Sequence, residues 1–237
     1  MKDQAREWLC PARSVAVLTG AGISAESGIP TFRGAGGLWR EYRAEDLATP
    51  QAFARDPKLV WEWYDWRRGV IAQAQPNAAH RALVQLERRA PEFTLITQNV
   101  DGLHDRAGSA RVLKIHGDIW ILRCSRCGRE HQDCRASIPD LPPRCACGGI
   151  ERPGVVWFGE ALPPDVWSCA EHAASRADVF LVIGTSAVVY PAARLVDIAK
   201  VRGAKVIEIN IAETAASAIA DISLRGAAAE ILPELLA

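Results

Sequence analysis

Short apolar runs alternate with amphipathic stretches along most of this chain. Such runs predict strands that are buried on both faces, and the stretches between them predict helices. The expected strands cover 14–18, 93–97, 112–115, 178–183 and 205–209, with a last one near Ile222. The expected helices cover 4–9, 78–89, 164–176 and 191–202, with a last one from Ala227. This alternation predicts an α/β fold with a Rossmann-like, doubly wound parallel sheet.

Two segments interrupt the alternation. Residues 46–75 turn helical, and Thr49-Pro50 and Asp56-Pro57 each place a capping residue before a proline at the first helical position. Residues 119–153 are rich in cysteine, proline and arginine and show little apolar periodicity. We therefore expect three parts: a Rossmann-like domain (1–34, 78–118 and 154–237), a lid loop with a helical insert (35–77), and a small inserted module (119–153).

The stretch from Ser14 to Trp39 carries the first candidate site. Gly20, Gly22 and Ala25 have the spacing G-x-G-x-x-A, where the first strand turns into a helix. Glycines at such a turn let the backbone approach a pyrophosphate, and the free amides at the helix start face the anion. Short glycine patterns also occur in plain turns, so this spacing alone leaves a phosphate loop and a plain turn open.

The residues after this loop argue against a dehydrogenase. Gly28-Ile29-Pro30 cut the helix short, and residues 32–37 form a loop where a dinucleotide fold would continue to a second strand. A long loop directly over a phosphate site predicts a lid across the reactive part of a nucleotide.

Polar clusters follow the carboxyl ends of five expected strands. They are Thr19-Gly20, Gln98-Asn99 with Asp101, His116, Ser186 and Asn210. In an open parallel sheet these ends line one crevice in which ligands bind. Each cluster alone is typical of turn and cap chemistry, but five converging clusters indicate a binding site.

Four cysteines in the inserted module have the layout of a metal site. Cys124-x-x-Cys127 is followed, after 17 residues, by Cys145-x-Cys147. Two pairs of thiolates are typical of a closed, structural Zn²⁺ site with no water for chemistry. The second pair is unusually close, and Cys134 is an alternative member of the set. Unrelated free thiols are the other interpretation, and the arginines beside the first pair indicate a solvated surface more than a nucleic-acid knuckle.

Composition narrows the class of protein further. The 237 residues suit one large domain or one domain with a small insert, and 49% hydrophobic residues are ample for a core. The 28 basic and 28 acidic residues balance, which gives no electrostatic case for nucleic acid or a membrane surface as a partner. No apolar run reaches the length of a membrane span, and the first seven residues lack a secretory pattern. The seven cysteines are odd in number and four have metal-like spacing, which favours a reducing cytoplasm over a disulfide scaffold. We therefore expect a cytoplasmic protein that binds neither a membrane nor nucleic acid directly. We also expect a monomer, a state to which the composition does not speak.

Together these motifs resemble the sirtuins, the NAD-dependent protein lysine deacylases. The resemblance rests on Gly20-Ala21-Gly22-Ile23-Ser24, Gly28-Ile29-Pro30-Thr31-Phe32-Arg33, Thr97-Gln98-Asn99-Val100-Asp101, His116-Gly117, the cysteine pairs, Gly184-Thr185-Ser186 and Asn210, in that order. The chain is similar to class III sirtuins in particular, through Thr31, the Tyr64-x-x-Arg67 pair and the stretch 155–160. The resemblance covers nearly the whole chain.

The resemblance implies a reaction and its residues. The acyl oxygen of a modified lysine attacks the ribose carbon of NAD as nicotinamide leaves. A ribose hydroxyl then attacks the resulting imidate, and water completes the release of free lysine and O-acyl-ADP-ribose. His116 is expected to act as the base on a ribose hydroxyl, with Asn99 and Asp101 as further catalytic residues. The implied NAD-binding residues are Gly20, Ala21, Gly22, Ala25, Thr31, Phe32, Arg33, Trp39, Gln98, Asn99, Val100, Asp101, Gly184, Thr185, Ser186, Asn210, Ile211, Ala212 and Ala228.

The resemblance also implies an acidic acyl group on the substrate. In class III sirtuins the pair matching Tyr64 and Arg67 binds the carboxylate of succinyl-, malonyl- or glutaryl-lysine, and Arg offers a planar fork suited to a carboxylate. The other implied substrate-binding residues are Ala48, which matches a pocket-widening residue, and Val156, Trp157, Phe158, Gly159 and Glu160, which resemble a peptide-clamping strand. The alternative is that Tyr64 packs among tryptophans while Arg67 points to water. We expect desuccinylase or demalonylase activity together with deacetylase activity on acyl-lysine proteins and peptides.

Two other functions stay open at this point. A protein ADP-ribosyltransferase would cleave NAD in the same way but pass ADP-ribose to a protein side chain. A non-catalytic NAD or ADP-ribose sensor would bind without turnover. The Tyr64/Arg67 pair weighs against the transferase, and intact His116, Asn99 and Asp101 weigh against the sensor.

Overall fold

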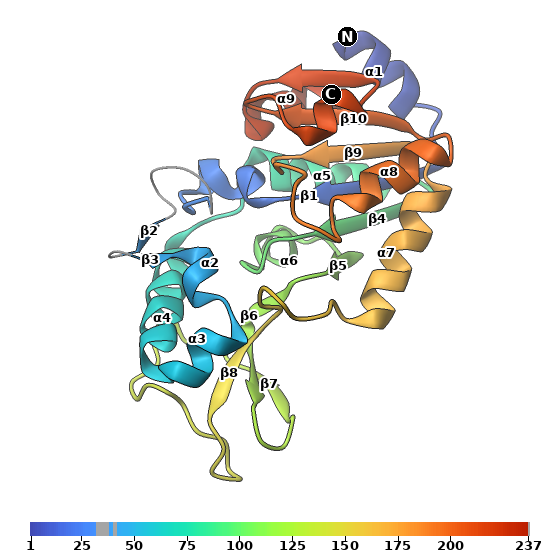
Figure 1. The fold of residues 1–237 in the computed structure, drawn as a ribbon. Coiled ribbons are helices and arrows are strands. Elements are labelled where there is room, and N and C mark those ends of the chain that lie inside the picture. Colours follow the sequence, from blue (N-terminus) through green and yellow to red (C-terminus); the bar gives the residue numbers. More distant parts are fainter. Residues whose placement is uncertain (32–37, 40–41, 237) are drawn as a thin grey trace.

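The computed structural model describes residues 1–31, 38–39 and 42–236, and its main feature is a six-stranded parallel sheet (Figure 1). The strands are β1 (Ser14–Thr19), β4 (Glu92–Thr97), β5 (Val112–Lys114), β9 (Val179–Ile183), β10 (Lys205–Asn210) and β11 (Ile222–Arg225), in the order β11-β10-β9-β1-β4-β5. After β1, the chain adds β4 and then β5 on one side of β1. It then adds β9, β10 and β11 on the other side of β1. The predicted doubly wound sheet is therefore confirmed, with a topological switch point beside β1.

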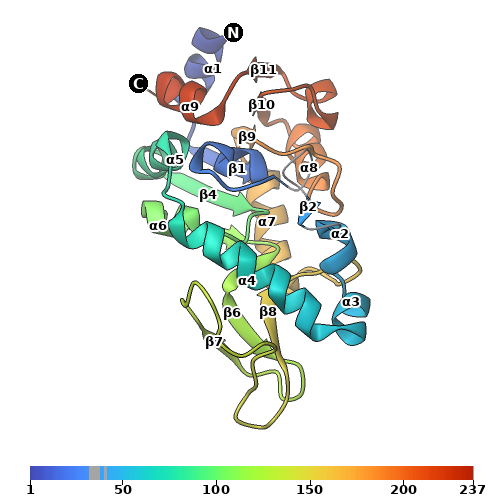
Figure 2. The same ribbon diagram turned by 90° about the vertical axis from the view of Figure 1, so that its left-hand side faces the viewer.

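Helices cover both faces of this sheet (Figure 2). One face carries α1 (Lys2–Leu9), α5 (Ala78–Arg89) and α9 (Ala228–Leu236), and the other carries α7 (Pro164–Arg176) and α8 (Arg194–Val201). Val15 and Val17 of β1 enter the first core, whereas Ala16 and Leu18 enter the second. Successive side chains of a strand point to opposite faces, so burial on both faces produces the continuous apolar runs that predicted these strands.

The predicted helix at 191–202 begins later than expected, at Arg194. Before it, the amides of Arg194 and Leu195 bond to the carbonyls of Pro191 and Ala192, three residues back. This tighter turn takes the place of the first α-helical turn. The short elements η1 (Ala21–Ser27), α6 (Leu103–Ala107) and η2 (Ala215–Ala218) and the hairpin β2 (Leu38–Trp39) and β3 (Tyr42–Arg43) carry too few residues for a periodic signal.

The helical insert contains α2 (Ala44–Leu47), α3 (Pro50–Arg55) and α4 (Pro57–Gln73). Both predicted caps are confirmed. The Thr49 hydroxyl accepts from the Ala52 amide at 3.0 Å, and the Asp56 carboxylate accepts from the Leu59 amide at 3.0 Å. Because each cap satisfies an amide that the first helical turn leaves without a partner, the two helices begin where the sequence places them.

A second, antiparallel sheet lies below the parallel one, and the sequence pattern did not predict it. Its strands are β6 (Gly117–Cys124), β7 (Glu130–Gln132) and β8 (Glu151–Val155), in the order β7-β6-β8. Ile119, Leu122 and Val155 share a core with Trp61 and Trp63 of α4. Within this core the Arg68 guanidinium pairs with the Asp133 carboxylate at 2.7 Å and ties α4 to the module. The three-part division of the chain stays a prediction.

No helix among the described residues combines the length and the apolar character that crossing a bilayer requires.

Candidate active site

The polar residues that follow the strands contact one another at the carboxyl edge of the parallel sheet. Gln98 donates from Nε2 to the Thr185 hydroxyl at 2.9 Å, and Asn99 donates from Nδ2 to the Gly20 carbonyl at 3.0 Å. Asn210 at the end of β10 donates to the Thr185 carbonyl at 2.9 Å. Segments far apart in the sequence therefore meet at one edge of the sheet, as the strand ends predict. Ser186 follows Thr185 directly and is half-buried.

The glycines of the first loop are required by packing. The Gly22 amide donates to the Gly184 carbonyl at 2.8 Å, and a Cβ on Gly22 would lie 2.8 Å from the Gly184 backbone. A Cβ on Gly20 would lie 2.7 Å from the Thr185 side chain. Side chains at these positions would thus push η1 away from the end of β9, whatever ligand the loop binds. Ala21 and Ala25 lie on η1, and Ala25 is exposed.

Asp101 and Ser24 form a buried pair beside this loop. The Asp101 carboxylate accepts from the Ser24 hydroxyl at 2.8 Å and from the Leu103 amide at 2.8 Å. The Ser24 hydroxyl also lies 3.3 Å from Asn99 Nδ2. Burial raises the pKa of Asp101, and its hydrogen bonds oppose that shift. Ser24 is missing from the predicted site residues, although its place in the Gly20–Ser24 motif is the signal that could have included it.

His116 lies between the carboxyl edge of the parallel sheet and the stretch after β8. Its Nδ1 lies 3.0 Å from the Gln98 carbonyl, and its own carbonyl accepts from the Val156 amide at 2.9 Å. A carbonyl can only accept, so the proton of the neutral ring sits on Nδ1 and leaves Nε2 as an acceptor. Burial lowers the pKa of His116, with the bond to Gln98 opposing. The ring is therefore neutral at pH 7 and able to take a proton at Nε2.

Tyr64 and Arg67 share a buried face of α4, with 3% and 8% of their surface exposed. Tyr64 packs against Trp61 and Trp63, and the Arg67 guanidinium lies 5.3 Å from the Trp63 ring centre. Burial raises the pKa of Tyr64 and lowers the pKa of Arg67, and Tyr64 and Asp101 counteract the shift of Arg67. The alternative in which Arg67 points to water is wrong, because packing turns that face of α4 inward.

The segment after β8 joins the helical insert to this site. The Phe158 amide donates to the carbonyl of Ala48, which is buried, while the Phe158 side chain is 44% exposed. Gly159 is in the left-handed region at φ 88°. Glu160, expected at the substrate, accepts from both terminal nitrogens of Arg152 at 2.5 and 2.8 Å. Its carboxylate is thus engaged in an ion pair.

The remaining predicted residues are less closely associated with the cluster. Ile211 and Ala212 follow β10 on the surface, and Ile211 is 76% exposed. Ala228 is buried at the first position of α9. Thr31 and Val100 are half-buried. Trp39 lies in β2, and Phe32 and Arg33, with the predicted lid at 32–37, lie outside the described residues.

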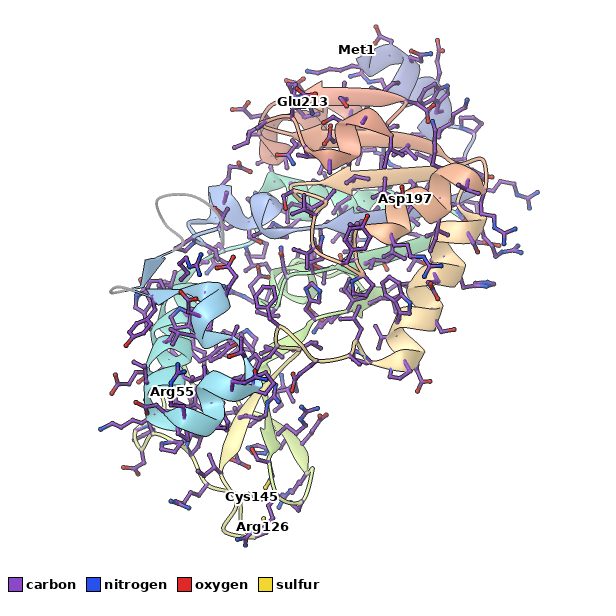
Figure 3. All side chains as sticks on the ribbon, viewed as in Figure 1. Met1, Arg55, Arg126, Cys145, Asp197 and Glu213 are labelled. Carbon is purple, nitrogen blue, oxygen red and sulfur yellow. The ribbon has the colours of Figure 1, made fainter. Side chains whose placement is uncertain are left out.

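The four predicted zinc ligands converge at the far end of the antiparallel module, where Cys145 lies beside Arg126 (Figure 3). The sulfur atoms of Cys124, Cys127, Cys145 and Cys147 lie within 4.8 Å of one another. Zn–S bonds of about 2.3 Å in a tetrahedron place sulfurs about 3.8 Å apart, so this group fits a four-thiolate Zn²⁺ site. The pKa of Cys124 is lowered to about 6, chiefly by a hydrogen bond from the Cys127 amide, and this favours the thiolate. The group does not include Cys134.

Residues 20–191 match the model of the Sir2 family. The chain belongs to this family. An NAD-dependent protein deacylase of Aquifex aeolicus is 57% identical over 213 residues, which cover 90% of this chain and 89% of that protein. The crystal structure of a Sir2 homologue–NAD complex is 52% identical with a TM-score of 0.95, covering 100% of this chain and 93% of that one. A Sir2–p53 peptide–NAD⁺ complex is 34% identical with a TM-score of 0.91, covering 100% and 97%.

Membership of the Sir2 family confirms the resemblance that the sequence motifs indicated. It also agrees with NAD as the cofactor and with a structural zinc site among the cysteines. The tasks of individual residues in the site stay predictions.

Proposed function

We propose that this Sir2-family chain removes acyl groups from lysine side chains of proteins and peptides and consumes NAD as co-substrate. The observation that carries the proposal is the position of His116. It bonds to Gln98 at the carboxyl edge of the sheet on one side and to Val156 of the predicted peptide clamp on the other. A neutral imidazole at that junction lies where a nucleotide and a modified lysine would meet. The names of the relatives, NAD-dependent protein deacylases, agree with this reaction.

The chain supplies binding and proton transfer in this reaction. NAD, when bound, supplies a ribose carbon whose bond to nicotinamide can break. The loop amides around Gly20–Gly22, with Gln98, Ser186 and Asn210, would hold the nucleotide at the carboxyl edge of the sheet. His116 Nε2 would take the proton of a ribose hydroxyl, and buried Asn99 and Asp101 would orient the ribose. Four cysteine thiolates leave a zinc ion no open position, so its contribution is structural.

We further propose that acidic acyl groups are preferred. Arg67 is a buried cation beside the Tyr64 hydroxyl, and its burial costs hydration free energy. A carboxylate placed there would offset this cost through charge-assisted hydrogen bonds to the guanidinium. An acetyl group carries no charge to offer in return. The preferred substrates are therefore succinyl-, malonyl- or glutaryl-lysine, with acetyl-lysine as a weaker substrate.

The peptide would bind along the stretch 155–160, and a related Sir2 structure contains a p53 peptide together with NAD⁺. We propose in addition that the enzyme acts as a monomer in the cytoplasm. These last two points rest on the sequence alone.

The test compares succinyl-lysine and acetyl-lysine versions of one peptide, with nicotinamide release as the measurement. The wild-type chain is expected to prefer the succinyl peptide. Arg67→Met is expected to lose most of that preference, because the cation that attracts the carboxylate is gone. Arg55→Met, on an exposed arginine of α3, is the matched control and is expected to behave as wild type (Figure 3).

Three outcomes would contradict the proposal. If Arg67→Met treats both peptides as the wild type does, the acidic preference is not set by Arg67. If the wild type releases no nicotinamide with either peptide, the chain is not a deacylase of this class. Transfer of ADP-ribose onto the peptide, in place of O-acyl-ADP-ribose, would identify a transferase.

A further inference from the structure

The Tyr64 hydroxyl has a fixed hydrogen-bond donor. Trp157 donates from its indole Nε1 to the Tyr64 oxygen at 2.8 Å, and both side chains are buried, at 2% and 3% exposed. An indole N–H can only donate, so the phenol oxygen is the acceptor in this bond. The Tyr64 hydroxyl proton is therefore directed away from Trp157, toward any further acceptor at that oxygen.

Trp157 is itself held on three sides. Its amide donates to Glu160 at 2.8 Å, and its ring lies 5.1 Å from the Phe53 ring at a 45° tilt. The Arg152 guanidinium carbon lies 3.4 Å from the ring centre on the indole face. A residue held at its backbone amide and at the face and edge of its ring has little rotational freedom, so the direction of the Trp157 indole N–H is fixed.

Arg152 and Glu160 complete this arrangement. Arg152 reaches both oxygens of Glu160, and the same guanidinium donates to the Val155 carbonyl at 2.9 Å. The Arg152 side chain is 9% exposed and the Glu160 side chain 23%, so water screens this ion pair only in part. The edge of the Arg152 guanidinium holds the Glu160 carboxylate, and the flat face of the same guanidinium covers the Trp157 indole. Lysine cannot make both contacts. Arg152 is absent from the predicted site residues.

We propose that Trp157, held by the Arg152–Glu160 pair, is a positioning residue for acyl selectivity, because it aims the Tyr64 hydroxyl proton at the carboxylate of an acidic acyl group. This inference rests on the proposed function and names the device that sets its substrate preference. Without the indole donor the hydroxyl can turn, and in the wrong orientation its lone pairs face the carboxylate. A neutral acetyl group gains little from the fixed orientation, so the effect appears in the ratio between the two substrates.

The test is a double-mutant cycle with Trp157→Phe, Tyr64→Phe and the double variant. Trp157→Phe removes the N–H and keeps an aromatic ring. The measurement is the ratio of affinities for succinyl-lysine and acetyl-lysine peptides without NAD, followed by the same ratio in kcat/KM. Loss of one hydrogen bond is expected to lower the ratio roughly fivefold in each single variant. The double variant is expected to fall no further, because both changes remove the same bond.

A second arm keeps the inference testable if Trp157→Phe is poorly folded. Arg152→Lys keeps the charge but loses the fork and the flat face, and it is expected to lower the same ratio. Arg144→Lys, on an exposed arginine of the zinc module, is the matched control and is expected to leave it unchanged. Thermal unfolding of each variant shows whether it is folded.

Three results would overturn the inference. They are an unchanged ratio in both Trp157→Phe and Arg152→Lys, an equal further fall when Trp157→Phe is added to Tyr64→Phe, and equal wild-type affinity for the two peptides. Failure of the deacylase proposal is distinguishable from these, because a chain without turnover would still show the affinity pattern.

Discussion

The imidazole rings of His80 and His104 lie 4.8 Å apart in the buried space between α5 and α6. His104 Nε2 lies 3.1 Å from the Thr19 hydroxyl, and His80 Nδ1 lies 3.0 Å from the Asn77 side chain. Desolvation lowers the pKa of His80 to about 4 and the pKa of His104 to about 3, with the repulsion of His80 adding to the shift of His104. Both rings are therefore neutral in the folded protein above about pH 5.

This pair predicts a loss of stability in mild acid. An unfolded histidine has a pKa of about 6.5, so below that pH the unfolded chain binds protons that the folded chain does not. The free energy of unfolding should thus be highest above pH 6.5 and decrease as the pH falls toward 4. His104→Gln removes one such group. Between pH 6 and pH 5, the free energy of unfolding of this variant should therefore decrease by about 1 kcal/mol less than that of the wild type.

Urea unfolding at several pH values measures this difference. His172→Gln, on an exposed histidine of α7, is the control and should follow the wild type. Parallel curves for His104→Gln and the wild type would show that His104 is protonated equally in both states.

His116 predicts the acid limb of the pH–rate profile. The proposed role of His116 as a base requires its neutral form, and burial lowers the pKa of His116, so kcat/KM should fall only as the pH drops through a value below 6.5. His116→Gln should lose roughly 10²- to 10⁴-fold in kcat/KM and lack this limb. A profile of nicotinamide release against pH measures both. An acid limb that persists in the variant would assign it to another group.

The cysteine group predicts one zinc ion per chain. Cys145→Ser should lose the metal and unfold at a lower temperature, because a structural zinc stabilises the fold that holds it. Cys134→Ser should keep both the metal and the unfolding temperature, since the group of four does not include Cys134. Metal analysis and thermal unfolding measure the two effects. Loss of zinc from Cys134→Ser would mean that this residue replaces one of the four.

The ion pair of Arg68 and Asp133 predicts a strong dependence of stability on one side chain. The Arg68 side chain is fully buried, and it also donates to the backbone carbonyls of Ile119 and Asp133. Arg68→Met would leave the two carbonyls without this donor and the Asp133 carboxylate paired with Arg135 alone, and it would lower the free energy of unfolding by about 2 kcal/mol. Arg55→Met, at an exposed position on α3, should change it by less than about 0.5 kcal/mol. Urea unfolding of both variants is the measurement, and equal effects would contradict the prediction.

The sequence predicted the parallel sheet because a strand buried on both faces is a continuous apolar run, a pattern that can be recognised locally. Strands such as β1 and β9 are continuous apolar runs, and Thr49 and Asp56 cap their helices through contacts only three residues away. The sheet β7-β6-β8 has no such pattern. β7 and β8 are short, and the buried apolar residues that the sheet contributes to the core shared with α4 are Ile119 and Leu122 of β6 and Val155 of β8, so no regular alternation develops.

By itself, the sequence determined the fold class, the family motifs and the cysteine spacing, because each depends on residue types at short separations. Only the tertiary structure decided that Arg67 is buried, that Trp157 donates to Tyr64, and that Arg152 covers Trp157. Tyr64 and Trp157 are 93 residues apart in the chain. A hydrogen bond between them follows from how α4 packs against the segment after β8, and local residue patterns carry no information about that packing.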